Sequence, residues 1–156
     1  MSARPERSTQ ISGDSIRLLS LVERAVTQRL DEALKAHGAG IDQWRILSLL
    51  VEQGGCPMNV VADHALLLAP KLSKLVDRMV SANLVMRRAD AQDRRRVLIV
   101  ASARGRQALT TWDAVAAEIQ DQFRQILGTD AGLLDDLLHR LSHGLTRSPA
   151  PATGTT

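Results

Sequence analysis

Apolar residues recur at every third or fourth position along five stretches of the chain, and this spacing predicts an amphipathic helix in each. The stretches span residues 16–34, 44–51, 72–79, 109–126 and 134–145. A shorter helix is expected at 60–67. Two runs rich in β-forming residues, 84–88 and 96–101, are separated by the polar sequence ADAQDRR. The pattern therefore predicts a mainly α-helical protein with one small β-ribbon.

Residues that favour helix ends mark the limits of these elements. We expect N-caps at Ser12 or Asp14, Asp42, Asn59 and Ser102, in chain order. Pro70 suits the first turn of a helix, where its missing N–H has no partner to lose. Asn83 suits the left-handed residue that ends one. Residues 1–13 and 147–156 show no periodicity, so we expect a flexible arm and a disordered tail around one domain at 14–146.

The first helix and the last two carry wide apolar stripes. Along 109–126 the apolar residues follow at intervals of 3, 4, 3, 4 and 3, which is the seam of a coiled-coil-like packing. The seam consists of Leu109, Trp112, Ala116, Ile119, Phe123 and Ile126, and the last stripe of Leu134, Leu137, Leu138, Leu141 and Leu145. These stripes either pack onto their own subunit or pair with a second copy of the chain.

Charge is distributed unevenly along the chain. Between Ala69 and Gln107 there are ten Lys and Arg residues against three Asp, a formal charge of +7. The whole chain is only +3, so the remainder carries −4. A concentrated basic block is the electrostatic pattern of a protein that binds nucleic acid.

The basic block coincides with a helix followed by the β-ribbon, which is the order of a winged helix-turn-helix. Such a helix enters the major groove of DNA while the ribbon reaches the adjacent minor groove. We expect base or backbone contacts from the start of the helix and from the turn of the ribbon. The candidates are Pro70, Lys71, Ser73, Lys74, Arg78, Asp93, Arg94, Arg95 and Arg96.

These candidates are expected to play different roles. Lys71, Ser73 and Lys74 lie in the first two turns of the helix, which suits contact with base edges. Arg78 lies further along, where contact with a phosphate is expected. Asp93 would hold a neighbouring guanidinium in a bidentate pair. Along an extended ribbon, side-chain alternation would turn at least one of the three consecutive arginines away from the groove.

The same residues resemble the MarR family of bacterial transcription regulators. That family typically shows D-x-x-D-R-R, a strand and then T-x-x-G-R; this chain has Asp90, Asp93, Arg94 and Arg95, followed by Ser102, Gly105 and Arg106. The segment LVDRM at 75–79 resembles the end of the family's recognition helix, and the resemblance runs from about 41 to 109. Pro70-Lys71 replaces a common hydroxyl pair and Asn83 replaces a frequent Gly, departures that bear on base preference.

The resemblance implies a winged helix-turn-helix at 41–101 between dimerisation helices at 14–40 and 102–146. It also implies a homodimer that binds double-stranded DNA at an inverted repeat and acts as a repressor. Arg94 best matches the family's minor-groove arginine. The segments DQWRIL and LAPKLSKL are similar to those of regulators of aromatic-acid catabolism. A small effector, an anionic aromatic compound, is therefore expected, with Arg17, Trp44 and Arg45 as candidate contacts. The alternative is that Trp44 is a core residue and Arg45 forms a surface ion pair.

Other functions find less support in the residues. His139 and His143 are spaced to share a zinc ion, but HExxH is absent and an Asp135–His139 surface pair explains the spacing. Cys56 has no partner cysteine and no basic neighbour to lower its pKa, so we interpret it as structural. A redox- or metal-responsive regulator of the same fold, or a module that binds an acidic protein, remains the alternative.

The sequence also predicts what the protein does not require. No nucleophile elbow, P-loop or dinucleotide-binding fingerprint is found, so we expect neither an enzyme nor a cofactor. No apolar run of about 18 residues and no signal-peptide pattern is present, and a cytoplasmic protein without a membrane partner is expected.

Overall fold

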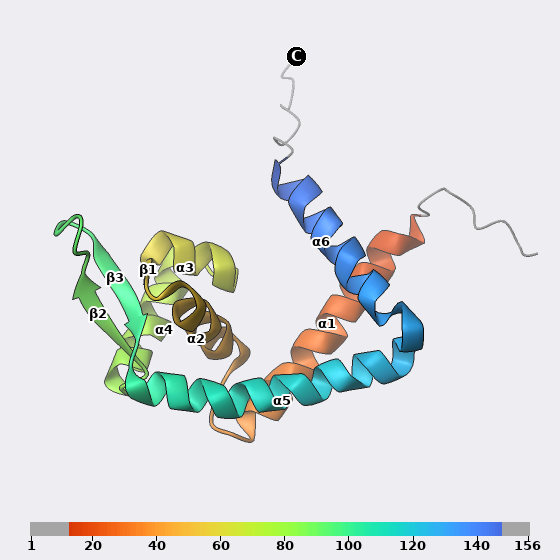
Figure 1. The fold of residues 1–156 in the computed structure, drawn as a ribbon, viewed down its shortest axis with the longest axis horizontal. Helices are drawn as coiled ribbons and strands as arrows, with labels where there is room; N and C mark the ends of the chain where they lie inside the picture. Colours follow the sequence, from red (N-terminus) through yellow and green to blue (C-terminus); the bar gives the residue numbers. More distant parts are fainter. Residues whose placement is uncertain (1–12, 148–156) are drawn as a thin grey trace, which may run out of the picture. The chain divides into compact units, whose positions relative to one another are not determined.

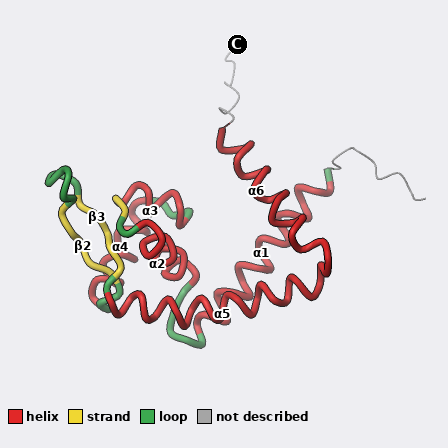
Figure 2. Tube along the Cα trace, in the orientation of Figure 1, coloured by secondary structure: helices red, strands yellow, loops and turns green. Residues whose placement is uncertain are grey.

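A computed structural model describes residues 13–147 of the chain. Its elements, in order, are α1 (Asp14–Lys35), α2 (Ile41–Gln53), β1 (Cys56–Pro57), α3 (Met58–Ala65), α4 (Ala69–Ser81), β2 (Val85–Ala89), β3 (Val97–Ala101), α5 (Ala103–Leu127), the 3-10 turn η1 (Gly128–Asp130) and α6 (Ala131–Arg147). Figures 1 and 2 show a mainly helical chain with one small sheet. The predicted fold class is confirmed. No helix within residues 13–147 has the length and apolar character needed to cross a bilayer.

The chain divides into two compact units, of which the first ends at Ala116 and the second begins at Ala117. The boundary falls inside α5. The first unit contains α1 to β3 and the start of α5, and the second contains the rest of α5, η1 and α6. The domain limits expected from the sequence stay predictions.

The core of the first unit is built from the apolar faces of short helices and the inner face of the sheet. Its most deeply buried side chains are Leu34, Ile46, Leu47, Leu50, Val61, Leu72, Val76, Met79, Val85 and Ile99. Every element from α1 to β3 except β1 contributes to this set. With so few aromatic residues, burial of branched aliphatic side chains provides most of the hydrophobic free energy.

The sheet has three antiparallel strands in the order β1-β3-β2. Val85 pairs with Ala101 and Ala89 with Val97, so β2 and β3 form the predicted hairpin, which extends beyond the helices that carry it (Figure 1). The sequence did not predict β1, in which Cys56 pairs with Ile99. This pairing buries Cys56 to 3% exposure, and burial raises the pKa of its thiol.

Three predicted helix starts were wrong by one or two residues. Asp14 is the first residue of α1 after Gly13, and Ser12 lies outside the described residues. Gly40, not Asp42, precedes α2; its N–H donates to the Gln43 side chain. Asn59 lies inside α3, because the helix already begins at Met58, directly after the extended residue Pro57.

The start of α2 is held from α1. The Asp31 carboxylate accepts the N–H of Ile41 at 3.0 Å and forms an ion pair with Lys35 at 2.8 Å. The bond from Lys35, and then that from the Ile41 amide, lower the pKa of Asp31 below its ordinary value. A carboxylate ten residues upstream therefore satisfies an amide that has no partner within its own helix.

The turn after α4 and the start of α5 meet at a close junction. Asn83 adopts the predicted left-handed conformation, at φ 57°. The Ser102 hydroxyl donates to the Asn83 carbonyl and accepts the Gly105 N–H at 2.9 Å, which confirms Ser102 as a helix cap. The Ser102 N–H donates to the Leu84 carbonyl at 3.0 Å. These hydrogen bonds connect the end of β3 to the turn that follows α4.

The apolar stripes of the terminal helices remain open to solvent in the single chain. In α1 only Leu30 and Leu34 are buried, while Ile16 is 73% exposed. In α5 the coiled-coil-like seam is buried at Leu109, Trp112 and Ala116, but Ile126 is 76% exposed. In α6 none of the leucines of the stripe is buried.

We expect Gly105→Ala to destabilise the first unit. A Cβ at this position would lie 2.0 Å from the Leu84 carbonyl oxygen, so the α5 backbone would have to move away from the hairpin. Overpacking of this kind costs about 3 kcal/mol, which urea denaturation would measure. Gly132→Ala in α6 is the control, because nothing lies within 4 Å of its added Cβ. An equal loss of stability in both variants would contradict the prediction.

Candidate nucleic-acid interface

The recognition-helix candidate α4 presents its charged residues on one exposed side. Leu72, Leu75, Val76 and Met79 form its buried face. At 100° per residue, Pro70 and Lys74 lie nearly opposite that face. Lys74 therefore lies near the middle of the exposed side of the helix, which suits a group that must reach a base edge.

The two edges of the exposed side face different neighbours. Lys71 and Arg78, seven residues apart, share the edge next to α2; Nζ of Lys71 lies 3.5 Å from Oδ2 of Asp42. Arg78 helps line a hollow of about 260 Å³ that includes Asp31 and Asp42. Lys71 and Arg78 thus belong to an edge that also carries negative charge, and the roles expected for them stay predictions.

Asp77 lies on the opposite edge and connects α4 to the wing. Its carboxylate forms an ion pair with Arg87 of β2. Both side chains are exposed, so the pair contributes less than about 1 kcal/mol to stability. Its effect is geometric, because it holds the base of the hairpin against the helix.

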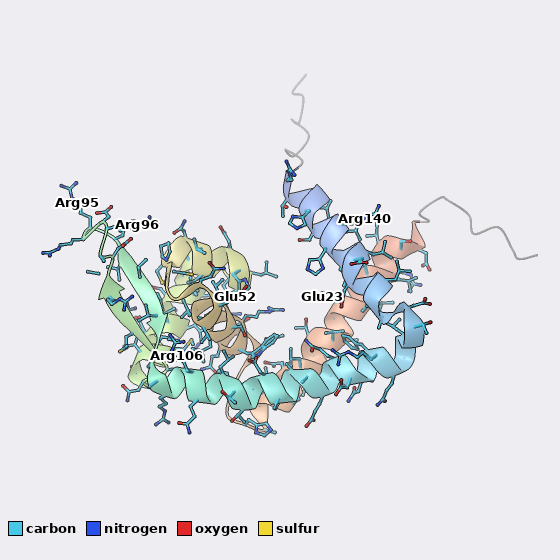
Figure 3. The ribbon with its side chains drawn as sticks, in the orientation of Figure 1. Glu23, Glu52, Arg95, Arg96, Arg106 and Arg140 are labelled. Atoms are coloured by element: carbon cyan, nitrogen blue, oxygen red, sulfur yellow. The ribbon has the colours of Figure 1, made fainter. Side chains whose placement is uncertain are left out.

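The tip of the hairpin is a hydrogen-bonded turn rather than extended strand. The Arg96 N–H donates to the Asp93 carbonyl at 2.9 Å, which makes Arg94 and Arg95 the two central residues of a β-turn. The expected alternation along the ribbon therefore does not apply to these two arginines. Figure 3 places Arg95 at the far end of the hairpin with Arg96 beside it.

The role expected for Asp93 was wrong in detail. Its carboxylate accepts the backbone N–H of Arg95 at 3.0 Å, and among the ion pairs of the described residues none joins it to a guanidinium. A backbone amide two residues ahead is the usual partner of an Asp side chain in a turn. Asp93 thus shapes the turn that carries Arg94 and Arg95.

The three residues expected to contact an effector each have a partner within the chain. Arg17 pairs with Asp14 at 2.9 Å, Arg45 lies 3.6 Å from Asp42, and the indole N–H of Trp44 donates to Asp113 at 2.8 Å. The ion pair of Arg45 agrees with the alternative interpretation of that residue, whereas the partner of Trp44 lies 69 residues away in the sequence. The contacts expected between these residues and an effector stay predictions.

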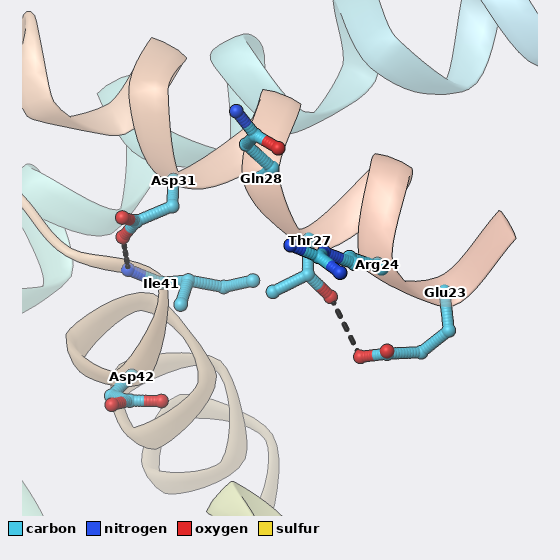
Figure 4. A pocket seen from close by; sticks show the side chains of 7 residues that line it. All are labelled: Glu23, Arg24, Thr27, Gln28, Asp31, Ile41 and Asp42. Carbon is cyan, nitrogen blue, oxygen red and sulfur yellow. Dashed lines mark hydrogen bonds between the residues drawn. The ribbon is translucent and has the colours of Figure 1, made fainter. Parts of the chain in front are cut away.

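Sequence reasoning missed a hollow between α1 and α2. It measures about 370 Å³ and is lined by Glu23, Arg24, Thr27, Gln28, Asp31, Ile41 and Asp42 (Figure 4). Arg24 lies seven residues after Arg17 and so on the same face of α1. The helical period places the two arginines on one face, and the fold shows that Arg24 borders the hollow.

The histidine pair offers no metal centre in this geometry. Nδ1 of His139 lies 2.8 Å from the backbone carbonyl of Asp135, not from its carboxylate. Within residues 13–147 no group of three or more His, Cys, Asp or Glu side chains is placed to hold a metal ion.

Comparison with known proteins identifies what the chain is similar to. A family model described as "MarR family" matches residues 37–96. The HTH-type transcriptional regulator FarR of Neisseria gonorrhoeae is 33% identical over 101 residues, 64% of this chain and 69% of the relative. The homoprotocatechuate degradative operon repressor of Escherichia coli is 29% identical over 110 residues, 70% of each protein. The crystal structure of NadR in complex with 4-hydroxyphenylacetate has a TM-score of 0.71 at 29% identity, covering 88% of this chain and 97% of NadR.

We expect Asp93→Ala to weaken DNA binding although it removes a negative charge from a basic loop. Losing the bond to the Arg95 amide loosens the turn, at a cost of about 1 kcal/mol, or about fivefold in affinity. Asp93→Asn removes the same charge but keeps an oxygen that accepts the bond, so it should bind at least as tightly as the wild type. Fluorescence anisotropy with labelled DNA would measure both. Tighter binding by Asp93→Ala would show that charge outweighs turn geometry.

Proposed function

The chain belongs to the MarR family of DNA-binding transcription regulators, and we propose that it is a cytoplasmic repressor that binds an inverted-repeat operator as a homodimer and is released by a small aromatic acid. The observation that carries the proposal is the shared basic face of α4 and the wing. Lys74 lies on the exposed side of the helix, away from its buried face, and Arg94 and Arg95 are the central residues of the wing turn. A helix and a ribbon so arranged fit adjacent grooves of one duplex.

The homodimer is supported by the apolar stripes that the single chain leaves open. Leu133, Leu137, Leu138 and Leu141 of α6 are between 41% and 50% exposed, and Leu18, Leu19, Leu21 and Val22 of α1 between 47% and 57%. Monomeric proteins rarely leave contiguous apolar surface of this kind uncovered. A second copy supplies a matching stripe, because a two-fold interface uses the same patch on both subunits.

Within the DNA complex we assign separate roles to the basic residues. Lys74 and Ser73 contact base edges, with Pro70 setting the start of their helix. Arg94 enters the minor groove, where a guanidinium sheds water more readily than an ammonium. Arg95 and Arg96 add phosphate contacts, as does Arg78 from the edge of the helix.

The proposed effector class follows from the relatives. One is named for a homoprotocatechuate operon and another was solved with 4-hydroxyphenylacetate, both small aromatic acids. In this chain we place the aromatic ring against Trp44 and the carboxylate near Arg45 or Arg24. Arg17, which pairs with Asp14 on an exposed face, is the more remote candidate.

Operator binding is the direct test of the proposed function. We expect DNA selected from a random pool to contain an inverted repeat whose half-sites are about 34 Å apart. Lys74→Ala should cost about 1–3 kcal/mol on that DNA and much less on random DNA, because it removes a base contact. Arg106→Ala is the control, since Arg106 lies in the first turn of α5, outside both α4 and the wing. Equal affinity of the wild type for selected and random DNA would refute sequence-specific regulation.

Effector binding is tested with the two aromatic acids that the relatives name. At a hundredfold excess over its Kd, a ligand stabilises the native state by about 2.7 kcal/mol, so 4-hydroxyphenylacetate or homoprotocatechuate should raise Tm and release the protein from its operator. Arg24→Gln and Arg45→Gln should reduce the response, whereas Arg17→Gln should reduce it less. If acetate, which has no ring, raised Tm as much as benzoate does, that result would argue against a site for aromatic acids.

A further inference from the structure

The ion pair between Asp42 and Lys71 joins the start of α2 to the first turn of α4. Nζ of Lys71 lies 3.5 Å from Oδ2 of Asp42, and Nη1 of Arg45 lies 3.6 Å from Oδ1 of the same carboxylate. Both distances are long for charge-assisted hydrogen bonds, so the interaction is mainly electrostatic. Each oxygen of Asp42 thus faces one cation, and only Lys71 belongs to the DNA-reading helix.

The two partners differ in how firmly they are held. Asp42 has a short side chain that is 25% exposed, whereas that of Lys71 is 68% exposed. The backbone around Asp42 is fixed by the bond from the Ile41 N–H to Asp31 (Figure 4) and by the bond from the Gly40 N–H to Gln43. Asp42 therefore presents a fixed negative charge, and Lys71 is the flexible partner that leaves or stays.

We propose that Asp42 moderates DNA binding by neutralising Lys71, and so sets how many effective cations the recognition helix presents to the phosphates. The inference rests on the function proposed above and adds a residue outside both the recognition helix and the wing. Phosphate contacts contribute most of the affinity for DNA of any sequence. A carboxylate that cancels one of them weakens binding to random and operator DNA together, and limits the time that the protein spends on random DNA.

The position of Lys71 supports this role over base reading. Lys71 and Arg78 lie on the α2 edge of α4, while Lys74 lies opposite the buried face. A lysine at the edge reaches the sugar-phosphate backbone beside the groove more readily than the base edges at its floor. Phosphate and Asp42 therefore compete for the same ammonium group.

The test compares Asp42→Asn with the wild type on selected operator DNA and on random DNA over a range of salt concentrations. We expect Asp42→Asn to bind both about two- to fivefold more tightly, the range for an exposed ion pair. The slope of log Kobs against log salt should steepen by about 0.9 per subunit, because one more cation displaces counterions. Glu52→Gln, which removes an exposed charge at the other end of α2, is the control and should change neither quantity.

A double-mutant cycle separates the proposed path from a general effect of charge. In a Lys71→Gln background, Asp42→Asn should leave affinity unchanged, and Asp42→Glu in the wild-type background should retain normal affinity. On random DNA, Lys71→Gln should cost less than Arg78→Gln, because Arg78 is the phosphate contact on the same edge and forms no ion pair among the described residues. This comparison does not require any Asp42 variant to fold. The proposal is overturned if Asp42→Asn gives the same gain with and without Lys71. A wild type that does not distinguish operator from random DNA would instead refute the proposed function.

Discussion

The junction between the turn after α4 and the start of α5 holds the recognition helix and the wing in one frame. The backbone of α5 approaches the Leu84 carbonyl so closely at Gly105 that no side chain fits between them. The Ser102 hydroxyl uses both its hydrogen-bonding roles there, as a donor to Asn83 and as an acceptor from Gly105. Reading two grooves of one duplex requires a fixed angle between helix and ribbon, and this junction, with the Asp77–Arg87 pair, supplies it.

Three Asp residues determine where the positive charge of the basic block is exposed, because each positions or neutralises a cation. Asp77 holds Arg87 at the base of the hairpin, Asp93 shapes the turn at its tip, and Asp42 faces Lys71 from a neighbouring helix. Lys74 and Arg94, which form no ion pair within the described part of the chain, are the cations proposed to enter the grooves. The formal charge of the block therefore overstates what the surface offers to a phosphate backbone.

The sequence predicted what depends on local periodicity but only part of what depends on local capping, since the starts of α1, α2 and α3 were misplaced by one or two residues. The helices, the hairpin, the left-handed Asn83 and the Ser102 cap all follow from residues close together in the chain. Strand β1 was missed because two residues are too few to show an alternation. The start of α2 was misplaced because its amide is satisfied by Asp31, ten residues away. The partners of Trp44 and Lys71 are even more remote in sequence, and so no local spacing rule predicts them.

The burial of Cys56 makes the sulfur a reporter of local opening. It is the single cysteine of the chain, it lies in β1 opposite Ile99 of β3, its side chain is buried, and burial raises the pKa of its thiol. A thiol reagent reaches the buried sulfur only when the structure around it opens, so the rate of modification measures the frequency of that opening. Since β3 also forms one side of the wing, the same rate, followed with and without DNA, reports how far the duplex stiffens the sheet from which the wing extends.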